Sequence, residues 1–270
     1  MGLFDRSSRR SPRRRPRGGT KLRDAYIPAD PVPAPGEPPA SPADAIGAAG
    51  VAPPRPLVWV GTAASGVSVW SSPMANSAGQ AVWAELQGVA GTTGAWPVLT
   101  GPTPVPGSWQ LAAGRSADDM VVPDAEPLLT AALAVSPAAE PGFKSRLEPT
   151  SEAVVEADVS AGYLAVVAGT DGWQLPVAVG FDGVGGWSAV EHAAVLRYWS
   201  RRYQADLVAL TESGIGLRIN RPPRTHEAAL AAAEEIYAYC PDVVTRGVGS
   251  MWALATTIAV SPAWSLRWAA

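Results

Sequence analysis

The sequence is poor in the residues that support thiol or metal chemistry. Its 270 residues include one cysteine and two histidines, which excludes an intramolecular disulfide and a zinc cluster built from cysteines. No run of 18 or more apolar residues occurs, so we expect no transmembrane helix. We expect neither a metal nor a cofactor.

Charged residues are also scarce. They make up 17% of the chain, against roughly 25% in an average soluble protein. Apolar residues make up 47%, enough to fill a core. Glycine and proline contribute 27 residues each, so a good part of the chain cannot form regular structure.

The charge that is present is divided unevenly. Residues 1–24 carry nine basic and two acidic side chains, a net charge of +7, and the other 246 residues carry 12 basic and 22 acidic ones, a net charge of −10. Such a basic segment buries too little apolar surface to fold alone. We expect a disordered tail that weakly contacts nucleic acid, anionic lipid or an acidic partner, or else the chain's own acidic body.

A proline-rich stretch follows the tail. Ten prolines lie between residues 28 and 56, and proline fixes φ and removes a hydrogen-bond donor, so an extended linker is expected here. We therefore divide the chain into a disordered tail and linker (1–55), the N-terminal part of the folded body (56–150) and a C-terminal domain (151–270). The arginine pairs are not followed by an apolar export segment, and we expect a cytoplasmic protein.

Hydrophobic patterns predict the elements of the body. Ser188 and Glu191 form a helix-start signature in which each side chain caps the backbone of the other. The expected strands lie at 57–60, 67–69, 96–99, 163–168, 175–181, 206–211, 214–220 and 264–268, and the expected helices at 78–89, 127–133, 188–203, 225–240 and 251–258. Closely linked strands favour an α+β fold with an antiparallel or mixed sheet and two to three packed helices in the C-terminal portion.

Several motifs of the C-terminal portion resemble one bacterial family. The motifs are Gly183–Trp187, Glu191–Trp199, Leu217-Arg218 with Arg221–Pro223, and Tyr237–Val244. They resemble the domain-of-unknown-function family 4253, common in actinobacteria, over about 176–270. Members often carry an Asn-x-Cys-Pro-like segment where this chain has residues 188–191, which counts against a shared cysteine nucleophile. The resemblance implies a fold and no established activity.

Candidate catalytic residues are few. Glu191 and His192 are the most tempting pair, but adjacent helical residues point about 100° apart and Glu191 has a capping role. Cys240 on a helical stripe is typical of a small core residue.

Candidate contact residues are easier to find. Arginine suits bidentate recognition of carboxylate or phosphate, and partly exposed tryptophan is a common interface anchor. The candidates for binding an anion or a partner are Arg218, Arg221, Arg224, Trp187, Trp264 and Trp268.

Two classes of function remain open. The first is a noncatalytic protein-interaction or regulatory module, in the manner of a bacterial immunity protein, with a protein as its partner. The second is an enzyme of unrecognised type that uses arginine and carboxylate groups near the Gly-Gly-Trp turn.

Overall fold

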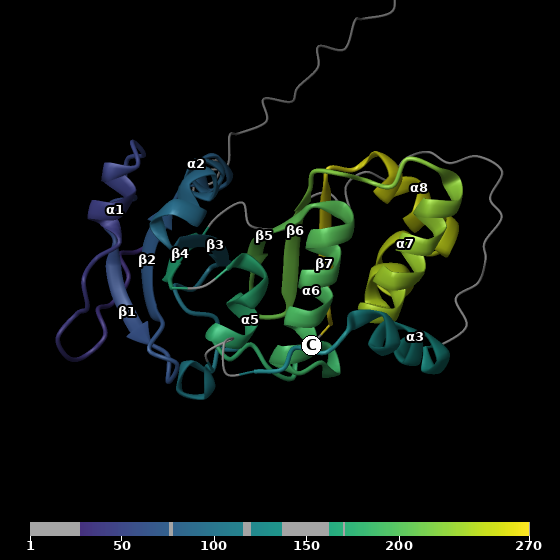
Figure 1. Ribbon diagram of the computed structural model, residues 1–270, viewed down its shortest axis with the longest axis horizontal. Helices are drawn as coiled ribbons and strands as arrows, with labels where there is room; N and C mark the ends of the chain where they lie inside the picture. The colour runs from purple at the N-terminus through teal and green to yellow at the C-terminus, as the bar shows by residue number, and fades with distance from the viewer. Residues whose placement is uncertain (1–27, 76–77, 116–119, 137–161, 170, 270) are drawn as a thin grey trace, which may run out of the picture.

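A seven-stranded mixed sheet forms the centre of the molecule (Figure 1). The structure, a computed structural model, describes residues 28–75, 78–115, 120–136, 162–169 and 171–269. The strand order is β1-β2-β4-β3-β5-β6-β7. Neighbouring strands are antiparallel except β3 and β5, which are parallel and share one paired position, Leu99 with Ala209. The strands are β1 (Val58–Thr62), β2 (Ser68–Met74), β3 (Ala95–Gly101), β4 (Gly162–Ala168), β5 (Ala205–Leu210), β6 (Gly214–Ile219) and β7 (Ala263–Arg267).

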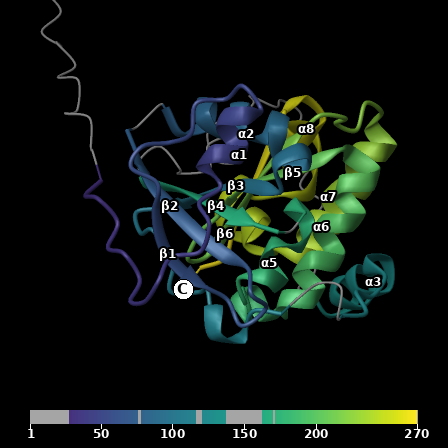
Figure 2. The ribbon, with the colours of Figure 1, turned by 60° about the vertical axis from the view of Figure 1, so that its left-hand side comes forward.

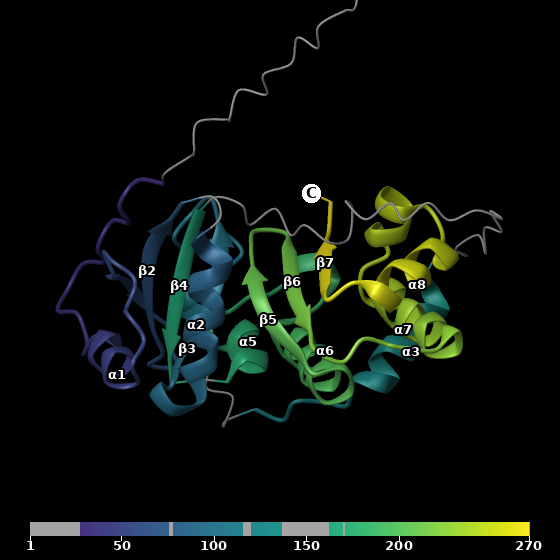
Figure 3. The same ribbon diagram turned by 90° about the horizontal axis from the view of Figure 1, so that it is seen from above.

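Helices lie on both faces of this sheet. α5 and α6 cover one face, α1 and α2 lie on the other, and α3, α7 and α8 stand together beyond β7 (Figures 1, 2 and 3). The helices are α1 (Ala43–Ala48), α2 (Ala78–Thr93), α3 (Ala125–Val135), α5 (Leu175–Ala178), α6 (Ala189–Tyr203), α7 (His226–Tyr239) and α8 (Met251–Val260), with short turns at Leu111–Ala113, Gly172–Gln174, Val184–Gly186 and Val243–Val248.

The alternation of side chains along the strands produces two apolar cores. In β4, Ala165 and Val167 face the core beneath α5 and α6, while Leu164 and Val166 face the core beneath α1 and α2. Successive strand residues point to opposite faces, so an unbroken apolar run indicates a strand that is covered on both sides. β4 is such a strand.

The predicted α+β class with a mixed sheet is confirmed. The two regions that we divided near residue 150 contribute to one sheet, because β4 lies between β2 and β3. The two parts are therefore interleaved.

The strand predicted at 175–181 is wrong. Its first residues form α5, which follows the short turn Gly172–Gln174. Asp171 and Gln174 cap that turn reciprocally, and Pro176 lies in the first turn of α5. All four residues of α5 are buried, and a helix buried all round has the same continuous apolar sequence as a buried strand.

The linker predicted before residue 56 is partly folded. It contains α1, whose Ile46 is fully buried and belongs to the same core cluster as Trp70 and Leu86, beneath α2. Upstream of α1, the Tyr163 hydroxyl donates a 2.8 Å hydrogen bond to the carbonyl of Ala29. The disorder predicted for residues 1–27 lies outside the described residues.

Candidate functional site

Two cavities lie beside α2, and we call them together the α2–β6 groove. One lies over the face of β5, β6 and β7 that α6 does not cover, and the other opens between β3 and β5 and reaches Leu196 and Ser200 of α6. α2 contributes residues spaced i, i+3, i+4 and i+7, which share one side of a helix. They line two cavities, one toward each end of this stripe. The stripe consists of Gln80, Trp83, Ala84 and Gln87.

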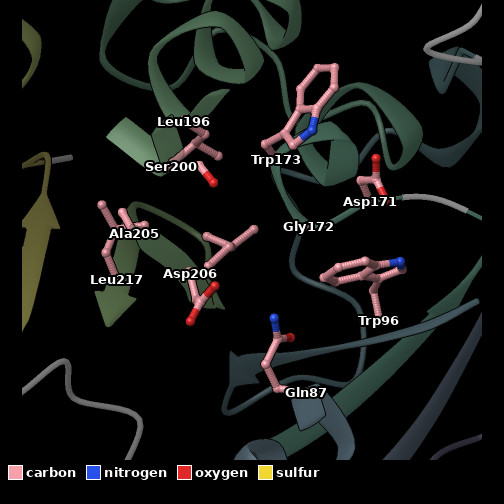
Figure 4. A pocket seen from close by; sticks show the side chains of 11 residues that line it. Gln87, Trp96, Asp171, Gly172, Trp173, Leu196, Ser200, Ala205, Asp206 and Leu217 are labelled. Atoms are coloured by element: carbon pink, nitrogen blue, oxygen red, sulfur yellow. The ribbon is translucent and has the colours of Figure 1, made fainter. Parts of the chain in front are cut away.

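The first cavity, of about 220 Å³, lies where β3 and β5 separate. These strands pair only at Leu99 and Ala209, near their carboxyl ends, so their amino ends diverge. The Trp96 ring and the Gln87 amide both extend toward the middle of the opening (Figure 4). The lining is Gln87, Trp96, Asp171, Gly172, Trp173, Leu196, Ser200, Ala205, Asp206, Leu207 and Leu217. This cavity contains two carboxylates and no basic lining residue.

The second cavity, of about 320 Å³, is mainly apolar. Small residues of β6 and β7, Gly216 and Ala263, lie at its base, beside Val208 of β5 and opposite Trp83. Small residues leave space above a sheet that larger side chains would fill. This cavity suits an apolar side chain.

An ion pair joins the two cavities. Arg218 Nη2 lies 2.8 Å from Asp206 Oδ2, and Arg218 Nε lies 3.3 Å from the same oxygen. The guanidinium carbon is 4.6 Å from the centroid of the Trp83 ring, an attractive cation–π distance. Asn220 donates a third hydrogen bond, of 2.8 Å, to Asp206 Oδ2. No donor among the described residues reaches Asp206 Oδ1.

The predicted pair Glu191 and His192 lies elsewhere, at the start of α6. The Glu191 carboxylate accepts hydrogen bonds from the amide and the hydroxyl of Ser188, and the Ser188 hydroxyl accepts one from the Glu191 amide. This is the capping box that the sequence predicts. His192 is fully buried beside Phe181, and its Nδ1 pairs with the Tyr239 hydroxyl. Burial lowers the pKa of His192 to about 3, against a smaller opposing effect of a backbone carbonyl.

The predicted contact residues are separated. Trp264 and Trp268 are only 1% and 7% exposed, and Trp264 also lines the second cavity; their role as partner contacts stays a prediction. Trp187 is half-buried and donates a 2.9 Å hydrogen bond to the carbonyl of Tyr239. Of the three arginines, Arg218 lies in the α2–β6 groove, while Arg221 and Arg224 are exposed in the loop after β6.

Sequence reasoning missed a polar network between α6 and α7. The Glu235 carboxylate accepts hydrogen bonds of 3.0–3.1 Å from Tyr198, Trp199 and Tyr203, and it lies 3.4 Å from Arg202. Burial raises the pKa of Glu235, and Arg202 opposes that rise. Glu235 follows the buried Ala232 by three residues, so the two lie on the same side of α7. A charged residue on the buried side of a helix is the sequence signal that could have identified this network.

The fold places the protein in the α+β class, with helices on both faces of a mixed sheet. Residues 163–269 match the model of one family, Domain of unknown function (DUF4253), so the predicted resemblance is confirmed over that stretch. The match includes Asp206 and Arg218, whereas α2 and Trp96 lie outside it. No curated protein and no solved structure matches the chain.

The described part of the chain offers neither a metal cluster nor a membrane-spanning helix. No cluster of three or more histidine, cysteine, aspartate or glutamate side chains is placed to hold a metal ion. Within the same residues, no helix has the length and apolarity needed to cross a bilayer.

Proposed function

We propose that this protein is a noncatalytic protein-interaction module and that the α2–β6 groove is its binding site. The observation that carries the proposal is the position of two cavities along one side of α2. One stripe of α2 borders a polar cavity and an apolar cavity, and a single ion pair joins them. A partner segment with a polar side chain next to an apolar one would fill both.

The state of the ionisable groups favours binding over catalysis. Asp206 Oδ2 is engaged by Arg218 and Asn220, so this oxygen is not free to act on a substrate. Glu191 is engaged in a helix cap, and His192 has no exposed surface. The acidic charge of residues 25–270 favours a basic partner.

The alternative, an enzyme that acts near the Gly-Gly-Trp turn, has one observation in its favour. A cavity of about 260 Å³ beside that turn is lined in part by Arg115, Asp182 and Ser188. Asp182 Oδ1, however, accepts a 2.9 Å hydrogen bond from the Ala189 amide, a capping role at the start of α6. The bacterial origin and the cytoplasmic location remain predictions from the sequence.

Site-specific photo-crosslinking tests the proposal. A benzophenone amino acid replaces Ala84, which lines the groove, or Glu85, which is exposed on the same helix and does not line it. A protein from the source organism that crosslinks from position 84 and not from position 85 is then purified. We expect it to bind the wild-type chain, and Ala84→Arg to weaken this binding at least about tenfold by filling the apolar cavity. Equal crosslinking from both positions, or full binding to Ala84→Arg, would contradict the proposal.

A further inference from the structure

We infer that the polar cavity of the α2–β6 groove binds a guanidinium group, that is, an arginine side chain. The inference rests on the proposed function, since it names what the partner inserts at the amino ends of β3 and β5. It depends on three observations: the charge of the cavity, the direction of the Trp96 ring, and the unused oxygen of Asp206.

The charge of the cavity selects a cation. Its lining includes the carboxylates of Asp171 and Asp206 and no basic side chain. Arg218, the nearest cation to Asp206, occupies Oδ2 from the neighbouring cavity. Arg197 lies over the ring of Trp173, a lining residue, and donates 3.0 Å hydrogen bonds to the carbonyls of Val122 and Pro123, so its guanidinium is already engaged.

The geometry selects a planar cation with several donors. The Trp96 ring extends into the cavity (Figure 4), and an indole face attracts a guanidinium laid over it. The Gln87 amide enters the same space from α2 (Figure 4), and its oxygen can accept one N–H. Asp206 Oδ1 can accept another, because a carboxylate offers about four acceptor positions and the described donors use only Oδ2.

The molecule already contains one arrangement of this kind. Arg218 stacks on Trp83 at 4.6 Å and donates to Asp206 Oδ2. A second guanidinium on Trp96 would donate to the other oxygen of the same carboxylate, so that Asp206 would lie between two cations. Arginine suits this role better than lysine because its planar fork combines stacking with directed hydrogen bonds.

The test compares two probes that differ in charge and not in shape. N-acetyl-L-arginine methylamide and its neutral isostere, N-acetyl-L-citrulline methylamide, are titrated into the full chain, and the indole N–H signal of Trp96, assigned with Trp96→Phe, is followed by NMR. We expect saturable shifts with the arginine probe and an affinity for the citrulline probe about five- to tenfold lower, because it lacks the cation–π and charge-assisted contacts. Equal affinity for both probes would overturn the inference.

Matched variants locate the site. Asp206→Asn should weaken the arginine probe about tenfold, because it removes the charge while retaining an oxygen that accepts a hydrogen bond from Arg218. Glu85→Gln removes the same charge from an exposed position outside the lining and should leave the affinity unchanged. In a second variant, Gln87→Arg, the cavity would contain its own guanidinium and binding of the probe should be lost. Equal effects of Asp206→Asn and Glu85→Gln would contradict the site.

A last comparison separates two sources of the guanidinium. Replacing the seven arginines of residues 6–17 by glutamine tightens probe binding if the chain's own N-terminal segment occupies the cavity. Unchanged affinity assigns the cavity to arginine from a second molecule; both results support the site. Should neither probe bind while Ala84→Arg still weakens the partner, the guanidinium inference fails and the proposed function stands.

Discussion

The buried imidazole of His192 makes the stability of the fold depend on mild acidification. The ring is fully buried among Phe181, Tyr239 and Trp268, and its pKa is lowered from 6.5 to about 3. Below pH 6.5 the unfolded chain binds a proton at this position that the native protein does not. The contribution of the neutral ring is therefore fully present above pH 6.5 and is lost progressively as the pH falls toward 3.

The magnitude follows from the two pKa values. Between pH 7.5 and pH 5.0, protonation of the unfolded chain at this one histidine lowers the free energy of unfolding by about 2 kcal/mol. The loss of about 2 kcal/mol depends little on the exact pKa of His192 in the native protein. At pH 5.0 the native imidazole is still unprotonated, because its pKa is about 3. For a protein whose total stability is roughly 5–15 kcal/mol, such a loss is readily measured.

Urea denaturation at the two pH values provides the assay. His192→Asn cannot titrate and places an amide near the position of Nδ1, so its loss of stability on acidification should be about 2 kcal/mol smaller than that of the wild type. His226, the other histidine of the chain, is exposed at the start of α7, and His226→Asn should show the wild-type difference. The reasoning fails if His192→Asn retains the full wild-type loss.

Three more substitutions test the local structure by urea denaturation. Gly185→Ala should lower the free energy of unfolding by at least about 1 kcal/mol more than Gly186→Ala. Both glycines have positive φ, but only a Cβ at position 185 would lie 2.2 Å from the buried indole nitrogen of Trp268. Equal losses for the two variants would contradict this packing. Glu235→Ala should lower the free energy of unfolding by roughly 2–5 kcal/mol, since it leaves buried donors unpaired. Glu234→Ala, at the exposed neighbouring position, should change the stability little. Similar losses in both variants would refute the network. Ser188→Ala removes the cap of α6 and should lower the free energy of unfolding by about 1 kcal/mol. An unchanged stability would show that the cap is dispensable.

The sequence predicted the elements whose signals are local. The capping box at Ser188 and Glu191 marks the start of α6 without reference to the rest of the fold, and the same is true of the cap at Thr225. α5 was mistaken for a strand because a short apolar run carries no information on its period. α1 was missed because the proline content of residues 28–56 outweighed Ile46, whose burial depends on α2.

The candidate site depends on contacts that are distant in the sequence. The polar cavity forms because β3 and β5 pair at Leu99 and Ala209, 110 residues apart, and nothing local predicts that pairing. Trp264 is predicted as a contact residue, but it lies on the buried face of β7, which depends on the helices packed against that strand. Arg218 was identified as a contact residue, whereas its partners Trp83 and Asp206 follow only from the fold.

The tryptophans of the chain provide the most direct test of the groove as the binding surface. Trp83 and Trp96 line its two cavities, whereas Trp199 and Trp268 belong to the core on the opposite face of the sheet. Indole N–H spectra of the full chain are recorded while the purified, crosslink-identified partner is added. We predict that the signals of Trp83 and Trp96 shift and saturate together while those of Trp199 and Trp268 stay in place. Saturable shifts confined to Trp199 and Trp268 would contradict the account.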